Sequence, residues 1–294
     1  MGKVCGAFDG CLSKVPDVGK GETGVQKVIE KRRTKVRARI KEIYDYREMI
    51  AALVKRDLKG RYKGSALGFL WTFLNPLFQL AVYTMVFSVI MKSGIKDYYL
   101  FLFVALIPWI FFGTSLTGGA GCILAQQDMV KKIYFPREVL PVSFVVSQFV
   151  NMLLSFLVIF LVLLLAGYTL HPMALLCLPI IMAVEFVLAL GFTFAASAVT
   201  VYFRDMEYIL GILSMAWQFL TPVMYSLEQV PQEVRWIFSV NPMTYVIVAY
   251  RDILYFGKLP RLETLIFALV LGLLVLAGGW MAFCRLQRHF AEEM

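Results

Sequence analysis

Charged side chains are scarce in this 294-residue sequence: Asp, Glu, Lys and Arg make up 17% of it, whereas hydrophobic residues make up 60%. Typical soluble domains are about half apolar and about a quarter charged. A soluble fold could not remove so much apolar surface from water. The composition therefore excludes an ordinary globular domain and indicates a protein of the lipid bilayer.

Sequence signals for catalysis are also missing. There is no G-x-x-x-x-G-K-[ST] phosphate loop, so we expect no ATP hydrolysis by that chemistry in this chain. Two His and five Cys, scattered along the chain, match no zinc pattern, and we expect neither a disulfide framework nor a metal site. We predict no catalytic residue and no cofactor in the chain itself.

The first 40 residues contain no apolar stretch, so we expect no cleavable signal peptide and assign targeting to the first span. The amino-terminal part of the chain is instead strongly basic. Before residue 71 there are 17 Lys and Arg against eight Asp and Glu, which accounts for the whole net charge of +9. We interpret residues 1–43 as a basic cytoplasmic arm that contacts anionic membrane lipids rather than nucleic acid.

Six apolar runs are long enough to cross a bilayer, since a helix needs roughly 20 apolar residues to span the ~30 Å hydrocarbon layer. The runs are residues 70–91, 100–122, 139–166, 174–201, 208–225 and 264–283. With the arm in the cytoplasm, both termini lie inside together with loops 123–138 and 202–207, and 23 of the 29 Lys and Arg are then internal. The positive-inside rule supports this orientation. The predicted fold is an all-α polytopic membrane protein.

Residues 44–66 are amphipathic. Apolar side chains recur at helical spacing from Tyr46 to Leu58, and cations occupy the other face, which predicts an amino-terminal interfacial helix in the membrane plane. The alternative is a cytoplasmic helix packed on a partner. Four cations lie at the depth of lipid phosphates, where they either bind an anionic group or simply anchor the helix. They are Arg56, Lys59, Arg61 and Lys63.

Polar side chains inside the predicted spans recur at helical spacing. They either line a hydrophilic path or form hydrogen bonds between helices, which are worth about 0.6 kcal/mol on average. Glu185 lies near the middle of the fourth span, so we expect it to face protein or water, or to be protonated. The candidates for the path are Asn75, Gln79, Tyr83, Gln148, Asn151, Glu185, Gln218 and Tyr225.

Two segments that connect the predicted spans contain short predicted helices. Residues 226–263 contain apolar stretches at 234–240 and 245–255 that are too short to span and are broken by prolines. They predict a re-entrant outer hairpin between helices five and six, or else a loop on the outer headgroups. Residues 124–134 predict a short polar helix between Gly121 and Pro136, which either docks on a soluble partner or is a solvated turn.

Three blocks resemble, in order, the membrane subunit of ABC type-2 transporters. They are residues 56–65 with 67–71 and 75–76, residues 129–141, and residues 241–245 with 251–252. The branch that they resemble exports cell-surface polysaccharides such as O-antigen, capsule or teichoic acid. The resemblance covers about residues 45–290, with the transmembrane domain at 67–288 and a cytoplasmic tail at 289–294.

The resemblance implies a permease that pairs with itself and with two copies of an ABC nucleotide-binding subunit, which holds ATP and Mg. The implied cargo is an undecaprenyl-diphosphate-linked glycan, whose diphosphate would lie on the four cations named above, at the cytoplasmic membrane. The resemblance also implies a coupling helix that fits the partner subunit. Its residues are Gln126, Asp128, Met129, Val130, Lys131, Lys132, Ile133 and Tyr134.

Other classes of protein compete with this interpretation. A type-2 exporter of a lipid or a drug would share the fold. A membrane-embedded glycan-modifying enzyme would need acidic residues in an aqueous loop, for which Asp205 and Glu207 are the internal candidates. A passive channel would conduct without ATP.

Overall fold

The computed structural model describes residues 38–62, 67–168 and 171–293, and all regular secondary structure in those ranges is helical. The all-α prediction is therefore confirmed for the described residues. The chain divides into two units, Met1–Asp45 and Tyr46–Met294. Residues 38–45 of the first unit are helical. The helices from α2 (Arg47–Tyr62) to the end of the chain belong to the second unit.

Five helical segments among the described residues are long and apolar enough to cross a membrane. They match five of the six predicted runs. The segments are Gly68–Ile90, which contains α3 (Trp71–Thr84); α4 (Tyr98–Ala120); α6 (Val139–Leu165); Pro172–Tyr202, which contains α7 (Pro172–Leu175) and α8 (Leu178–Tyr202); and Leu262–His289, which contains α12 (Leu262–Leu286).

The predicted span at 208–225 is different. Its helix, α9 (Met206–Phe219), has 14 residues, which at 1.5 Å per residue reach only about 21 Å, less than the ~30 Å hydrocarbon layer. Pro222 disfavours a helical conformation in Thr221, and turns and a bend follow as far as residue 225. The count of six spans is not confirmed and stays a prediction.

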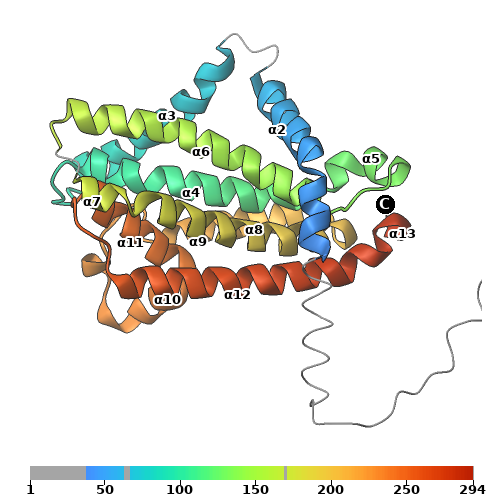
Figure 1. Cartoon of the computed structure of the whole chain (residues 1–294). Coiled ribbons are helices and arrows are strands. Elements are labelled where there is room, and N and C mark those ends of the chain that lie inside the picture. Colours follow the sequence, from blue (N-terminus) through green and yellow to red (C-terminus); the bar gives the residue numbers. More distant parts are fainter. Residues whose placement is uncertain (1–37, 63–66, 169–170, 294) are drawn as a thin grey trace, which may run out of the picture. The chain divides into compact units, whose positions relative to one another are not determined.

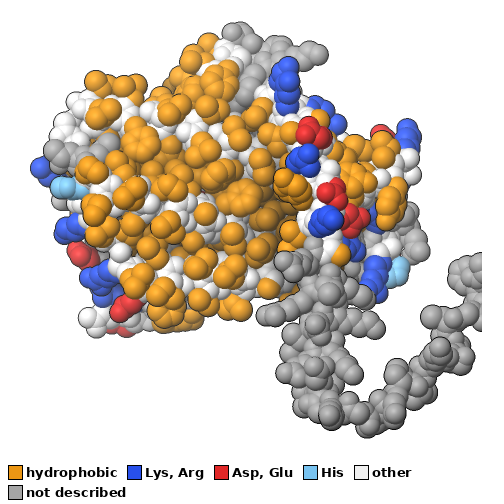
Figure 2. Space-filling view, viewed as in Figure 1, with side chains coloured by type: hydrophobic (Ala, Val, Ile, Leu, Met, Phe, Trp, Pro, Cys, Tyr) orange, Lys and Arg blue, Asp and Glu red, His pale blue; other side chains and the backbone are white. Residues whose placement is uncertain are grey.

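Helix α4 is at the centre of the bundle. Buried residues make up 83% of the apolar segment of α4, but only 11% of the apolar segment of Gly68–Ile90. A helix that is apolar on all sides is suited to such a central place. In Figure 1, α4, α6, α8, α9 and α12 run roughly side by side. Figure 2 shows hydrophobic side chains over the middle of this bundle and charged side chains toward its two ends, the pattern expected of a membrane-embedded surface.

Helices α8 and α12 approach each other at two glycines. A Cβ atom on Gly279 would lie 2.0 Å from the carbonyl oxygen of Gly191, and one on Gly191 would lie 2.6 Å from the backbone nitrogen of Leu276. A Cβ atom on the neighbouring Gly278 would meet nothing within 4 Å. Small residues of this kind let helix backbones pack closely in membranes.

Two short helices precede α12, namely α10 (Arg235–Val240) and α11 (Pro242–Leu254). Asn241 joins them: its side-chain oxygen accepts hydrogen bonds from the Met243 backbone N–H (3.0 Å) and from Trp217 Nε1 of α9 (3.0 Å). Its amide nitrogen donates to the Leu220 carbonyl (3.0 Å). The side chain therefore caps α11 and fastens it to the end of α9. Re-entry of this hairpin into the membrane stays a prediction.

Candidate functional site

Helix α2 (Arg47–Tyr62) packs against α6 through the apolar stripe predicted from the sequence. Leu53 is buried, and Met49 and Ile50 pack partly buried against the same hydrophobic cluster. The Ser147 hydroxyl of α6 donates a hydrogen bond to the Asp57 carboxylate. The stripe thus holds α2 on the bundle, while the position of α2 in the membrane plane stays a prediction.

The four cations predicted to bind a diphosphate do not form a single cluster among the residues that the structure describes. Arg56 lines a cavity of about 790 Å³ whose walls also carry Gln126, Ser143 and Glu207. Lys59 lines a separate groove on α2. The side chain of Arg61 and the whole of Lys63 lie outside the described residues. The two cations that the structure does place are both exposed.

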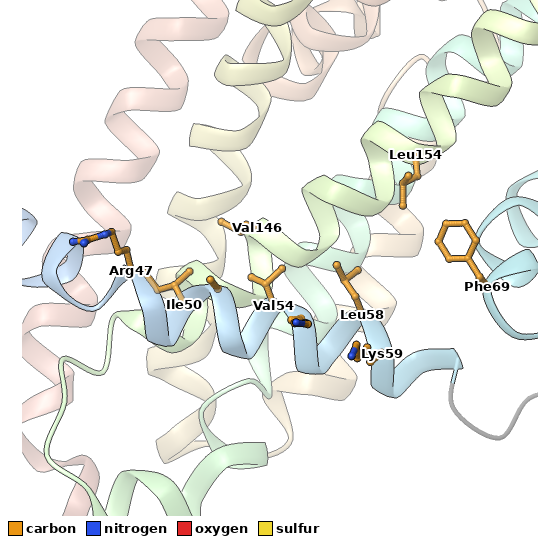
Figure 3. Close-up of a pocket in the computed structure, with 10 residues that line it drawn as sticks. Arg47, Ile50, Val54, Leu58, Lys59, Phe69, Val146 and Leu154 are labelled. Carbon is orange, nitrogen blue, oxygen red and sulfur yellow. The ribbon is translucent and has the colours of Figure 1, made fainter.

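The groove beside Lys59 has a volume of about 930 Å³ and mainly apolar walls. Figure 3 shows Val54 and Leu58 of α2 facing Val146 and Leu154 of α6, with Phe69 closing the far end. The cations Arg47, Lys55 and Lys59 also line the groove. Apolar walls with a cationic border suit an amphiphile, because the two parts of the molecule need opposite surroundings.

The predicted docking loop forms a 3₁₀ turn, Leu124–Gln126, followed by α5 (Gln127–Lys132). The helix ends two residues before the predicted boundary at 134, since Ile133 is already extended on the way to Pro136, with φ −127° and ψ 134°. Ile133 is 58% exposed and Tyr134 is 90% exposed. Large apolar side chains presented at a loop are typical of a surface that binds another protein.

Other residues of this loop point into the protein. Val130 is buried in a hydrophobic cluster, to which Leu53 of α2, Phe194 of α8 and Phe283 of α12 also belong, and Met129 packs against it. Phe290 of α13 (Phe290–Glu293) belongs to it as well. We call this cluster the lower cluster. Of the predicted docking residues, Gln126 is half-buried and the exposed ones are Asp128, Lys131, Lys132, Ile133 and Tyr134.

The candidates for a translocation path are spread over several faces. Asn75 is exposed on α3, and Gln79 Nε2 donates to its side-chain oxygen (3.2 Å). Tyr83, Asn151, Gln218 and Tyr225 are half-buried, whereas Gln148 is buried. Glu185 faces protein: it is fully buried and accepts a hydrogen bond from the Tyr250 hydroxyl (2.7 Å). A shared path through these residues stays a prediction.

Sequence reasoning did not assign a role to Arg251 of α11. Its guanidinium is buried, donates to the carbonyl oxygens of Val223 (2.7 Å) and Tyr225 (3.2 Å), and lies 3.6 Å from the ring centroid of Phe101. A cation inside an apolar stretch is costly unless it has partners, so its position within residues 245–255 was the signal available from sequence.

The sequence pattern of the family described as "ABC-2 type transporter" matches residues 48–255, more than half of the chain. The chain belongs to the ABC-2 type transporter family. This confirms the resemblance found in the sequence. As an ABC-2 protein the chain is an integral membrane protein and the transport component of an ABC transporter, a class that works with a nucleotide-binding partner.

Known ABC-2 relatives align over most of their lengths. The chain is 37% identical over 257 residues to the O-antigen export system permease protein RfbA of Myxococcus xanthus, covering 87% of this chain and 98% of that protein. It is 30% identical over 245 residues to the RfbA protein of Klebsiella pneumoniae, covering 83% and 94%. It is 24% identical over 209 residues to the polysialic acid transport protein KpsM of Escherichia coli, covering 69% and 80%.

Proposed function

We propose that this chain is the permease subunit of an ATP-driven exporter that moves an undecaprenyl-diphosphate-linked cell-surface polysaccharide, of the O-antigen, capsule or teichoic acid type, across the cytoplasmic membrane. The observation that carries the proposal is the alignment with an O-antigen export permease over 98% of that relative's length. The polysialic acid transport relative supports a polysaccharide cargo rather than a drug.

The groove and the cations of α2 supply a physical basis for loading such a substrate. The isoprenoid chain would lie on the apolar walls at Val54 and Val146, and the diphosphate would lie beside Lys59 at the border of the same groove. Arg56 lines the other cavity but precedes Lys59 by three residues on α2, so its side chain would reach the same diphosphate. Guanidinium groups can hold phosphate oxygens bidentately, and ammonium groups add point charge. Arg61 and Lys63, which follow in the sequence, would complete the cationic patch.

The assembly that we propose contains two copies of this chain and two nucleotide-binding subunits, which carry ATP and Mg. Little of Gly68–Ile90 is buried within one chain, although its α3 carries the exposed Asn75 and the half-buried Gln79. Amide side chains are costly against lipid tails. A second copy of the chain would cover this face and could place the glycan path between the two copies. The exposed residues of the 126–134 loop would contact the nucleotide-binding subunit.

A reconstituted complex tests the function. Its ATPase rate should rise on addition of an undecaprenyl-diphosphate-linked oligosaccharide and should not rise with undecaprenyl phosphate alone, since the glycan is the cargo. Stimulation by the bare lipid to the same extent would instead identify a lipid exporter. Glycan hydrolysis or transfer without ATP would identify the alternative of a glycan-modifying enzyme.

The orientation predicts a pattern of chemical labelling. In a cysteine-free background, single cysteines at positions 131 and 205 should react only from the cytoplasm, and those at 96, 171 and 233 only from outside. Impermeant maleimide applied to cells and to inverted vesicles measures this. Positions 205 and 233 flank α9, so labelling of both from one side would remove the sixth span and the cytoplasmic carboxyl terminus from the proposal.

Replacing Arg56 and Lys59 together by Gln is expected to lower export per correctly inserted complex by at least about tenfold, because hydrogen bonds to charged groups are worth about 1.5–3 kcal/mol each. Glycan transport into inverted vesicles, normalised to inserted complex, measures the effect. Arg285→Gln is the control, since Arg285 is an exposed cation in the last turn of α12 and lines neither cavity. Unchanged export in the double variant would leave these cations as membrane anchors only.

A further inference from the structure

A third pocket lies between the short helices α10 and α11, the turn at 226–228 and the start of α12, and its volume is about 480 Å³. That volume is within the range of about 300–1,000 Å³ typical of small-molecule sites. We call it the α10–α11 pocket. Thr244, Val248 and Arg251 line it from α11. Their spacing of four and seven residues puts them on one face of the helix.

Arg251 is a buried cation in the lining of this pocket, and among the described residues no carboxylate forms an ion pair with its guanidinium. Its three hydrogen bonds all go to backbone carbonyl oxygens, those of Phe101, Val223 and Tyr225. A guanidinium has five N–H donors, so two remain after these three bonds. Buried charges are ordinarily paired with an opposite charge, and an oxyanion in the pocket would supply the missing partner.

Thr244 is a second, independent sign of a ligand. The residue is only 4% exposed, and its hydroxyl oxygen is buried without a hydrogen-bond partner. Such unsatisfied groups are rare and costly in folded proteins, at about 1–3 kcal/mol each. A ligand in the pocket could satisfy the hydroxyl together with Arg251, two turns further along the same helix.

The remaining walls specify what kind of oxyanion fits. Arg235 and Arg261 are exposed cations of the lining, and Glu228 and Asp252 supply carboxylates that can accept hydrogen bonds from hydroxyl groups. The aromatic residue Tyr245 also lines the pocket, with its ring stacked on that of Phe267. A ligand with one oxyanion, several hydroxyls and a compact ring matches all of these features.

We propose that the α10–α11 pocket binds one acidic sugar unit of the exported glycan, with the sugar carboxylate on Arg251 and Thr244. This rests on the proposed function for the origin of the sugar. The binding itself does not require transport. The pocket would give the exporter a preference for glycans that contain a uronic-acid-like residue.

Binding of methyl glucuronide to the full complex in phosphatidylcholine nanodiscs tests the proposal, with calorimetry as the measurement. Methyl glucoside is the matched neutral ligand, and glycerol phosphate is the probe for a lipid headgroup. We expect saturable binding of the glucuronide, with an affinity at least about tenfold higher than that of the glucoside, because only the former offers a charged partner to Arg251.

Thr244→Val is the decisive variant, since it removes the hydroxyl and keeps the shape. It should weaken glucuronide binding about tenfold while leaving the melting temperature unchanged or higher, because the lost hydroxyl has no partner in the free protein. Thr84→Val is the control: the Thr84 hydroxyl of α3 is also buried without a partner, but it lies outside the pocket. Arg261→Gln, at an exposed position, should weaken binding without affecting folding.

Equal affinity for glucuronide and glucoside would overturn the proposal, as would unchanged glucuronide binding in both Thr244→Val and Arg261→Gln. Tight binding of glycerol phosphate with none of the glucuronide would reassign the pocket to a lipid headgroup. Absent glucuronide binding with retained glycan-stimulated ATPase activity would reject the pocket alone. Retained glucuronide binding without that stimulation would reject the proposed function alone.

Discussion

Replacing Gly279 by Ala is expected to abolish the folded transporter. The added Cβ atom would lie 2.0 Å from the carbonyl oxygen of Gly191, and backbone, unlike a flexible side chain, cannot move aside cheaply. Helices α8 and α12 would have to separate along their shared face. Overpacking typically costs about 1–3 kcal/mol and sometimes more, and a backbone collision of this size belongs at or above the upper end. We expect little monodisperse protein after detergent extraction.

Gly278→Ala is the matched control for this prediction. It makes the same chemical change one residue earlier on α12, where a Cβ atom meets nothing within 4 Å. Ala also favours a helix over Gly by about 1 kcal/mol, so this variant should be extracted as well as the original protein or better. Size-exclusion profiles and thermal melting curves compare the two. Equal behaviour of both variants would show that α8 and α12 do not approach at these glycines.

The double substitution of Ile133 and Tyr134 by Asp is expected to separate the permease from its ATPase. Both side chains are largely exposed, so the chain should still fold and insert. Loss of an aromatic anchor at the centre of an interface costs about 2 kcal/mol or more, or roughly 30-fold in affinity. Copurification of the nucleotide-binding subunit on a tagged chain measures the effect, and ATP-driven export should fall with it.

Two further variants test whether the effect is specific to the docking surface. Phe203→Asp alters another exposed apolar side chain, in a loop that we place on the same side of the membrane, and should leave copurification intact. Val130→Asp should instead lower the amount of folded chain, since Val130 is buried in the lower cluster and an unpaired carboxylate there is costly. If the Ile133 and Tyr134 variant kept normal copurification and export, the docking surface would have to lie elsewhere.

The sequence was most informative where a single physical requirement decides the outcome. The hydrocarbon layer imposes a minimum length on an apolar run, and five such runs match spanning helices closely. The run at 208–225 satisfied the same requirement, yet its helix ends at Phe219. Thr221 precedes Pro222, and the local cost of a helical conformation there outweighs the apolar character of the run.

Side-chain direction was harder to predict in short elements. Helix α5 has only six residues, too few for a periodic pattern to identify the face that packs, so Val130 and Tyr134 were indistinguishable as docking residues. The α10–α11 pocket was beyond sequence reasoning for another reason. Its lining comes from α4, α10, α11 and α12, and the hydrogen bonds of Arg251 depend on which backbone carbonyls the fold brings to it.

The lower cluster has a mechanical consequence. It joins Val130 of α5, next to the surface that would receive the ATPase, to Leu53 of α2, next to the cations that would receive the substrate. Close-packed interiors have low compressibility, so a displacement of α5 is not absorbed between the two. We therefore expect a movement of α5 to be passed to α2 through this cluster, which also includes Phe194 of α8 and Phe283 of α12.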